Sequence, residues 1–153
     1  MDALTLRAAT LGDATALTRL ALRAKASWGY DAAFMEACRE ELTVTPNMLA
    51  AWRFWVAELG RVIVGMIALD AEGEAAHLEF FFVDPDHQGQ GIGRALMAAF
   101  NAACRELGFT RVEVDADPNA EAVYQRLGYR TVGYAPSGSI PGRMLPRMQL
   151  TLS

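Results

Sequence analysis

The sequence predicts a single α/β domain, residues 1–153, with a mixed and mostly antiparallel β-sheet flanked by helices. Apolar residues recur at helical spacing in some segments and alternate in others, giving the order β-α-α-β-β-β-α-β-α-β-β. Turn-forming residues separate these segments, and no repeat, linker or low-complexity tract interrupts them. A chain of 153 residues is also long enough to bury one sizeable core.

Two helices are expected after the first strand. The segment 10–13 has the pattern of a helix N-cap box, and the apolar face after it consists of Leu17, Leu20 and Ala24. A second helix begins near Asp31 and places three apolar residues about one turn apart, at Phe34, Cys38 and Leu42. Pro46 and Asn47 break or restart this helix.

Three strands follow in the middle of the chain. Residues 52–58 and 62–69 are strand-like, and the tight turn Leu59-Gly60-Arg61 between them predicts an antiparallel hairpin. A second turn at 70–73 leads into the third strand, residues 75–83.

The C-terminal half alternates helices with strands. A long helix should end at Gly108, and its buried apolar face should consist of Ile92, Leu96, Phe100, Ala103 and Leu107. The remaining expected elements are a strand at 111–115, a helix at 119–127, a strand at 129–134, a Pro-, Gly- and Ser-rich loop at 135–146, and a last strand in which Met148, Leu150 and Leu152 alternate.

The composition is that of an ordinary soluble globular protein, with 52% hydrophobic and 21% charged residues. The net charge of −4 argues against tight nucleic-acid binding, which depends on Lys and Arg neutralising phosphates. No apolar run is long enough to span a membrane and the N-terminus has no signal-peptide pattern, so we expect a cytoplasmic protein. Cys38 and Cys104 lack metal or redox spacing; we expect two buried free thiols and no metal site.

The segment with the clearest functional meaning is VDPDHQGQGIGRAL, at residues 83–96. Gly89, Gly91 and Gly93 stand at alternate positions between a strand-like run and a helix-like run. Glycines let the backbone approach a ligand closely, and the start of the following helix presents unpaired N–H groups. Together these features predict a site for a phosphate or pyrophosphate group.

Two familiar phosphate motifs fit this segment badly. A P-loop requires a Gly-Lys pair, which is absent, and the dinucleotide fingerprint requires a glycine where Arg94 stands. Glycines alone are also compatible with an ordinary tight loop.

The order Gln88-x-x-Gly91-x-Gly93 before a helix resembles the acyl-coenzyme-A signature of the GCN5-related N-acetyltransferases. A second resemblance lies at 115–129, where the family's later motif falls on Asn119, Ala122, Tyr124, Gly128 and Tyr129. The two motifs occur in the family's order within residues 74–134, whereas the first half of the chain agrees only in its order of elements. The resemblance implies transfer of an acetyl group from acetyl-coenzyme A directly to a primary amine of a small molecule or peptide.

The resemblance also implies which residues hold the coenzyme. Its pyrophosphate would lie on the backbone N–H groups of Gln88, Gly89, Gln90, Gly91, Ile92, Gly93 and Arg94. Its pantetheine arm would pair with the main chain at Phe81, Phe82 and Val83, where the family's sheet opens. A strand buried on both faces would have the same apolar sequence at 80–83. Asn119 would hold the coenzyme or the local turn, and an ordinary N-cap asparagine is the alternative.

Tyr124 is the family's usual general acid, which would protonate the departing thiolate; a packed core tyrosine is the alternative. Glu79 and His77 are two residues apart on one strand and share a face, which Phe81 is expected to continue. Either could accept the amine proton, directly or through water, or could be a polar residue at the sheet surface. Glu79 is favoured because it would lie nearer the thioester. His87 is expected to be a solvent-exposed loop residue.

The acceptor pocket of this family usually involves the region between the first two helices. Trp28 and Tyr30 could form an apolar wall or a cage for a cation, or could pack on the core. Three glutamates, Glu36, Glu40 and Glu41, could add negative charge or form a solvated helix face. No firm role is assigned to Ser137, Ser139 and Arg143, and a homodimer through the last strands is compatible with the resemblance.

Two other functions stay open on the sequence. One is a non-catalytic acyl-coenzyme-A-binding module that senses or regulates, against which Tyr124 and a nearby base argue. The other is a nucleotide- or dinucleotide-binding protein, against which the missing third glycine argues.

Overall fold

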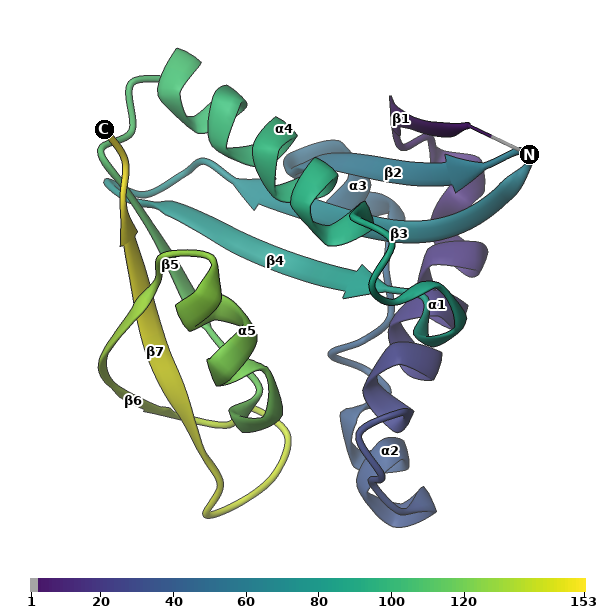
Figure 1. Cartoon of the computed structure of the whole chain (residues 1–153). Coiled ribbons are helices and arrows are strands. Elements are labelled where there is room, and N and C mark those ends of the chain that lie inside the picture. The colour runs from purple at the N-terminus through teal and green to yellow at the C-terminus, as the bar shows by residue number, and fades with distance from the viewer. Residues whose placement is uncertain (1–2) are drawn as a thin grey trace.

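A computed structural model describes residues 3–153, which form one seven-stranded sheet in the order β1-β2-β3-β4-β5-β7-β6 (Figure 1). Neighbouring strands are antiparallel except β4 and β5, which are parallel. The strands are β1 Leu4–Ala8, β2 Arg53–Leu59, β3 Val62–Asp70, β4 Ala76–Val83, β5 Arg111–Asp115, β6 Arg130–Pro136 and β7 Met144–Thr151. The helices are α1 Ala14–Ala26, α2 Ala32–Cys38, α3 Pro46–Ala51, α4 Ile92–Glu106 and α5 Glu121–Arg126. The expected mixed, mostly antiparallel sheet with flanking helices is confirmed.

The first half contains one helix more than the sequence suggested. α2 ends at Cys38 instead of continuing to Leu42, and the chain after it makes tighter backbone turns, with bonds from Arg39 N to Glu36 O and from Thr43 N to Glu40 O. Leu42 is nevertheless buried in the core. α3 is a new helix, with Pro46 in its first turn and the Thr45 side chain accepting from Met48 N.

Each face of the sheet has its own hydrophobic core. α4 and α5 pack on one face, and α1 and α2 pack on the other (Figure 1). Leu96 and Phe100 of α4 are completely buried, and each such side chain contributes roughly 1.5–3 kcal/mol. Leu107 does not continue this face and is 57% exposed, because α4 has already ended. Gly108 ends the helix as expected, in the left-handed conformation with φ 86°.

β4 contains a bulge that changes the direction of its side chains. The register with β3 shifts between Met66 and Ala68, and Phe80 has φ 48°, a strained value for an aromatic residue. Phe80 packs in the core on the α1 side, and Phe81 packs in the core on the α4 side. The extra residue in β4 puts Glu79 and Phe81 on opposite faces of the sheet. The expectation that Phe81 continues the face of Glu79 is therefore wrong.

The sheet opens between β4 and β5. These two strands pair only at Ala76↔Val112 and His77↔Glu113. Beyond His77 the edge of β4 is unpaired on this side, which leaves room for another chain-like molecule along it.

The C-terminal hairpin is longer than expected. Residues 144–146 of β7 pair with β6, so the loop between these strands covers only residues 137–143. Cys38 and Cys104 are buried and free, as expected. Within residues 3–153, no helix combines the length and hydropathy that a membrane crossing requires.

Candidate active site

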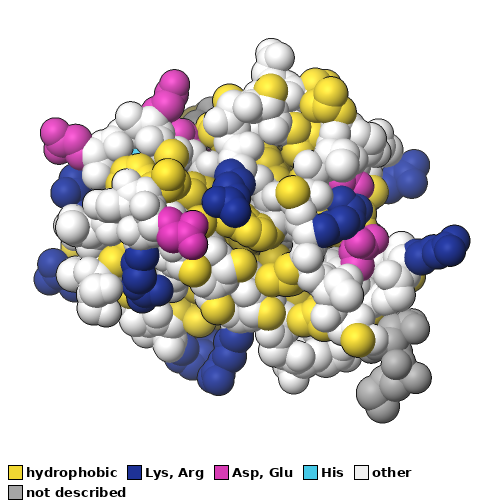
Figure 2. Space-filling model, turned by 90° about the horizontal axis from the view of Figure 1, so that it is seen from above, with side chains coloured by type: hydrophobic (Ala, Val, Ile, Leu, Met, Phe, Trp, Pro, Cys, Tyr) yellow, Lys and Arg dark blue, Asp and Glu magenta, His cyan; other side chains and the backbone are white. Residues whose placement is uncertain are grey.

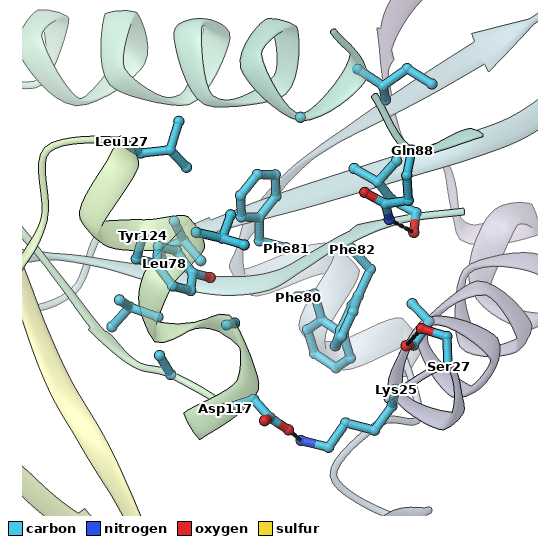
Figure 3. Close-up of a pocket in the computed structure, with 18 of the residues that line it drawn as sticks. Lys25, Ser27, Leu78, Phe80, Phe81, Phe82, Gln88, Asp117, Tyr124 and Leu127 are labelled. Carbon is cyan, nitrogen blue, oxygen red and sulfur yellow. Dashed lines mark hydrogen bonds and ion pairs between the residues drawn. The ribbon is translucent and has the colours of Figure 1, made fainter. Parts of the chain in front are cut away.

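A cleft of about 1050 Å³ lies along the free edge of β4. Residues 78–83 of β4 form one side of it, and residues 114–117 together with α5 form the other. The glycine-rich turn closes one end, and the C-terminal end of α1 contributes Lys25, Ser27 and Trp28. Figure 3 shows this arrangement, with Phe80, Phe81 and Phe82 between the turn and α5.

The backbone of β4 offers hydrogen-bonding groups to the cleft at alternate residues. Asp84 N donates to Val64 O at 2.8 Å, so the backbone groups of Asp84 and Phe82 face β3. By the alternation of an extended strand, those of Phe81 and Val83 face the cleft. The side-chain amide of Gln88 donates to Val83 O at 3.1 Å (Figure 3). Phe81 and Val83 are thus the residues whose main chain can pair with a bound arm, whereas Phe82 lines the cleft with its side chain.

The glycine-rich turn has the backbone conformation that the sequence suggested. Gly89 has φ 77° and Gly91 has φ 80°, a region that residues with a side chain rarely adopt. Gly91 caps the 15-residue helix α4, whose first N–H groups have no partner within the helix. Of the seven residues expected around the pyrophosphate, six line the cleft: Gln88, Gly89, Gly91, Ile92, Gly93 and Arg94. Gln90 is exposed outside it.

An ion pair fixes the start of this turn. The Asp84 carboxylate is buried and accepts from both terminal nitrogens of Arg23, at 2.8 and 3.0 Å, and from Asp86 N at 2.9 Å. Burial would raise the pKa of Asp84, but these hydrogen bonds outweigh burial and lower it. His87 lines the cleft and its side chain is only 30% exposed, so it is less open to solvent than expected.

Tyr124 and Glu79 lie in the middle of the cleft. Tyr124 projects from α5 beside Phe81, with ring centroids 6.0 Å apart, and is 6% exposed (Figure 3). Burial, followed by the negative charge of Glu79, raises the pKa of the Tyr124 phenol. Burial also raises the pKa of Glu79 to about 7, with further contributions from Asp70 and Asp115. At neutral pH the phenol is therefore protonated and the carboxyl group is poised to exchange a proton.

Two other expected residues lie away from the centre of the cleft. His77 forms the last rung between β4 and β5, its side chain is 44% exposed, and its Nε2 lies 3.9 Å from Glu113 Oε2. It does not line the cleft. Asn119 also lies outside the lining, and its amide nitrogen donates to the Tyr30 hydroxyl at 2.8 Å. The Asn119 side chain thus contacts a distant residue and does not cap its own turn. The carboxylate that caps the turn, accepting from Asn119 N at 2.8 Å, is that of Asp117, so the N-cap alternative for Asn119 is wrong.

Lys25 and Asp117 line the end of the cleft away from the glycine-rich turn, and they form a polar cluster with Tyr30 and Arg143, which lie outside the lining. Lys25 Nζ is 2.7 Å from Asp117 Oδ2, and the Tyr30 hydroxyl is 2.9 Å from both oxygens of that carboxylate. Arg143 Nη2 donates to the Tyr30 hydroxyl and lies 3.4 Å from Asp117 Oδ2. Tyr30 is thus tied to this cluster and stacks on Phe34, while Trp28 lines the cleft.

The other candidate acceptor residues have structural partners. Ser139 Oγ donates to Glu41 Oε2 at 2.9 Å, which links the loop after β6 to the segment after α2. Glu36 pairs with Arg39 at 3.0 Å on an exposed helix surface, and Glu40 is exposed. Ser137 accepts from Ile140 N at 3.1 Å within its own loop.

Sequence reasoning missed Lys25 and Asp117. Lys25 is an ordinary basic residue at the end of a helix, and nothing in its spacing relates it to a residue 92 positions later. Asp117 precedes Pro118, a pattern typical of a helix start, but on the sequence Asn119 is considered as the cap and Asp117 has no assigned role.

Comparison with known proteins identifies the family. The model of the family described as "Acetyltransferase (GNAT) domain" matches residues 17–152. Human N-acetyltransferase 8 is 31% identical, with 65% of this chain and 48% of that protein covered. The mycothiol acetyltransferase of Propionibacterium freudenreichii is 40% identical over 36% of this chain and 20% of its own length. The chain thus spans less than half the length of these curated relatives.

Solved structures share the fold over the whole chain. A GCN5-related N-acetyltransferase from Rhodopseudomonas palustris superimposes with a TM-score of 0.84 at 23% identity, covering 99% of this chain and 98% of that one. The PaiA N-acetyltransferase from Thermoplasma acidophilum, in complex with coenzyme A, gives 0.81 at 16% identity, covering 97% and 99%. With the family model matched from α1 to the last strand, this chain belongs to the GNAT family of acetyltransferases.

Proposed function

We propose that this protein is an N-acetyltransferase that takes an acetyl group from acetyl-coenzyme A and transfers it directly to a primary amine of a small molecule or peptide. The observation that carries the proposal is the shared cleft: a phosphate-binding type of turn, a free strand edge, a buried phenol and a carboxyl group of raised pKa all line it. Acetyl-coenzyme A supplies an activated thioester when bound.

The residues present suit such a donor. Gly89 and Gly91, with φ 77° and 80°, leave the N-terminal end of α4 open to a pyrophosphate. Gly93 leaves space between the turn and Phe81, because a Cβ added at Gly93 would lie 3.5 Å from the Phe81 ring. Phe81 and Val83 then bind the arm through their main chain, once the Gln88 amide releases Val83 O. The arm so placed leads toward Tyr124.

Glu79 serves as the base in this proposal. An amine must lose a proton to act as a nucleophile, and a carboxyl group with a pKa of about 7 is partly ionised at neutral pH. Burial, the largest cause of this shift, also limits the access of bulk water to the proton. His77 is the weaker candidate, because it lies outside the lining of the cleft.

Tyr124 serves as the acid. Its phenol is protonated across the physiological pH range and can donate to the sulfur as the C–S bond breaks. The negative charge of Glu79 opposes this donation, because it raises the pKa of the phenol. Once Glu79 has accepted the amine proton that charge is gone, so the phenol becomes more acidic at the moment when the thiolate needs a proton. The two proton transfers therefore support each other.

A panel assay tests the proposal. The protein is incubated with acetyl-coenzyme A and amines of several classes, and free thiol release and acetylated product are measured together. Amine-dependent thiol release with a matching mass increase of 42 Da is expected, the exchange of one amine hydrogen for an acetyl group. Binding of acetyl-coenzyme A without transfer to any amine would instead favour a non-catalytic sensor. If NAD competes for the site and coenzyme A does not, a dinucleotide-binding protein would be favoured.

A further inference from the structure

The polar cluster of Lys25, Tyr30, Asp117 and Arg143 carries more positive than negative charge. Lys25 and Arg143 each contribute one positive charge, and Asp117 contributes one negative charge, because its hydrogen bonds outweigh burial and lower its pKa. Tyr30 is a neutral phenol whose pKa is raised by burial and by Asp117. One positive charge is thus left without a counter-charge inside this cluster.

Both cations are partly buried and retain hydrogen-bond donors. The side chains of Lys25 and Arg143 are 13% and 17% exposed, so their charges act more strongly than on an open surface. An ammonium group has three donors, of which Lys25 uses one on Asp117. Within residues 3–153, the Arg143 guanidinium makes hydrogen bonds only through Nη2. The Phe34 and Tyr30 rings hold its guanidinium in place, with centroids 4.9 and 5.2 Å from Cζ.

Two carboxyl groups line the middle of the cleft, those of Glu79 and Asp115, and Asp115 is paired with Arg147 at 2.9 Å. Negative charge on Glu79 attracts an amine in its cationic form to this part of the cleft. Figure 3 shows Lys25 reaching from α1 to Asp117, on the far side of Phe80 from Gln88. The cleft therefore presents a carboxylate region and, beside it, a region with an unbalanced positive charge.

We propose that the acceptor carries a carboxylate as well as the amine, as an amino acid does, and that Lys25 binds this carboxylate, while Arg143, behind the lining of the cleft, supplies the excess positive charge. The inference rests on the proposed function, and it narrows the acceptor from any primary amine to one with an anionic group near it. A polyamine fits less well, because its second cation would meet the excess positive charge. Lys25 and Arg143 are then specificity-determining residues, with no part in the proton transfers.

Matched acceptors test this without any mutation. Amino acids are compared with their carboxamides and with the corresponding decarboxylated amines, at a pH chosen for equal free amine. Charge-assisted hydrogen bonds predict a kcat/KM at least about tenfold higher for the acids. Equal or higher kcat/KM for the amides, or for polyamines, overturns the inference while leaving the proposed function intact. If no amine of any kind is acetylated, the proposed function fails and the inference falls with it.

Variants identify the residues. Lys25→Met and Arg143→Gln should raise KM for the acids by roughly tenfold, with little effect on kcat, on the amides or on KM for acetyl-coenzyme A. Lys25→Arg keeps the charge and should restore most of the preference for acids. Arg19→Gln, which removes an exposed positive charge from the same helix, is the matched control. An acid preference that persists in both neutralising variants, each with an unchanged melting temperature, would overturn the assignment.

Discussion

The Glu79 carboxylate acts on the Tyr124 phenol and raises its pKa, although the two residues come from different elements, β4 and α5. Two ionisable groups whose environments drive them to different protonation states are the usual arrangement for an acid and a base. Here burial is the largest cause of both pKa shifts, so the surrounding apolar side chains raise the pKa of both groups. Three predictions concern this site, and a fourth concerns the ion pair between Arg7 of β1 and Asp13, which precedes α1.

Replacing Tyr124 with Phe keeps the ring and removes the hydroxyl. If the hydroxyl protonates the thiolate, kcat should fall by roughly 10²–10⁴-fold, while acetyl-coenzyme-A affinity changes little. Turnover and calorimetric binding are measured on the same preparation. Tyr134→Phe, at a tyrosine that is 64% exposed, is the control. Near-normal turnover in Tyr124→Phe would remove this residue from the mechanism.

Glu79 should control the pH dependence of the reaction. A base must be ionised, and the pKa of Glu79 is raised to about 7, so activity should increase as pH rises through about 7. Glu79→Gln should lose most activity at neutral pH and recover part of it at high pH, where free amine forms without help. His77→Ala, two residues away on the same strand, should keep the wild-type profile. Identical profiles for all three proteins would assign proton removal to water.

Substitutions in the glycine-rich turn should weaken coenzyme binding while the fold persists. Gly91→Val forces a β-branched residue to φ 80° at the start of α4, and Gly93→Val directs methyl groups toward Phe81 and Val83. We expect at least a tenfold loss of affinity for coenzyme A by calorimetry, with a cooperative unfolding transition retained. Gly12→Ala is the control, since its added Cβ meets nothing closer than 3.8 Å. Unchanged affinity in folded variants would contradict the role of this turn.

Asp13 should contribute to stability in a pH-dependent way. It accepts from Arg7 at 2.8 and 3.0 Å, and these bonds outweigh burial and lower its pKa to about 2. A group with a lowered pKa stabilises the fold fully above its ordinary pKa, and the effect is lost as pH falls toward 2. Asp13→Asn should therefore lower the free energy of unfolding by about 1 kcal/mol at pH 7 and by almost nothing near pH 2. The value at pH 7 takes into account that Arg7 is partly exposed, which weakens the ion pair.

Urea unfolding of both proteins at several pH values measures this difference. Glu72→Gln, at an exposed residue, is the control and should show no such dependence. A cost that is constant with pH would mean that packing and not charge explains the effect.

The sequence by itself predicted the structural features that depend on local periodicity and local turns. The spacing of Leu96 and Phe100 places them on the buried face of α4, and they are buried in the structure. The positions of Gly91 and Gly108 marked the two ends of that helix, because few other residues adopt the conformation required there. The opening beside β4 came from the family resemblance.

The tertiary structure alone decided how distant residues meet. The bulge at Phe80 depends on pairing with β3, and it puts Glu79 and Phe81 on opposite faces of the sheet. The alternation of residue types along the strand does not reveal such a bulge. Lys25, Asp117 and Arg143 come from three segments far apart in the sequence, which meet only in the folded chain. Burial raises the pKa values of Glu79 and Tyr124, and burial is a property of the packed molecule and not of the residues themselves.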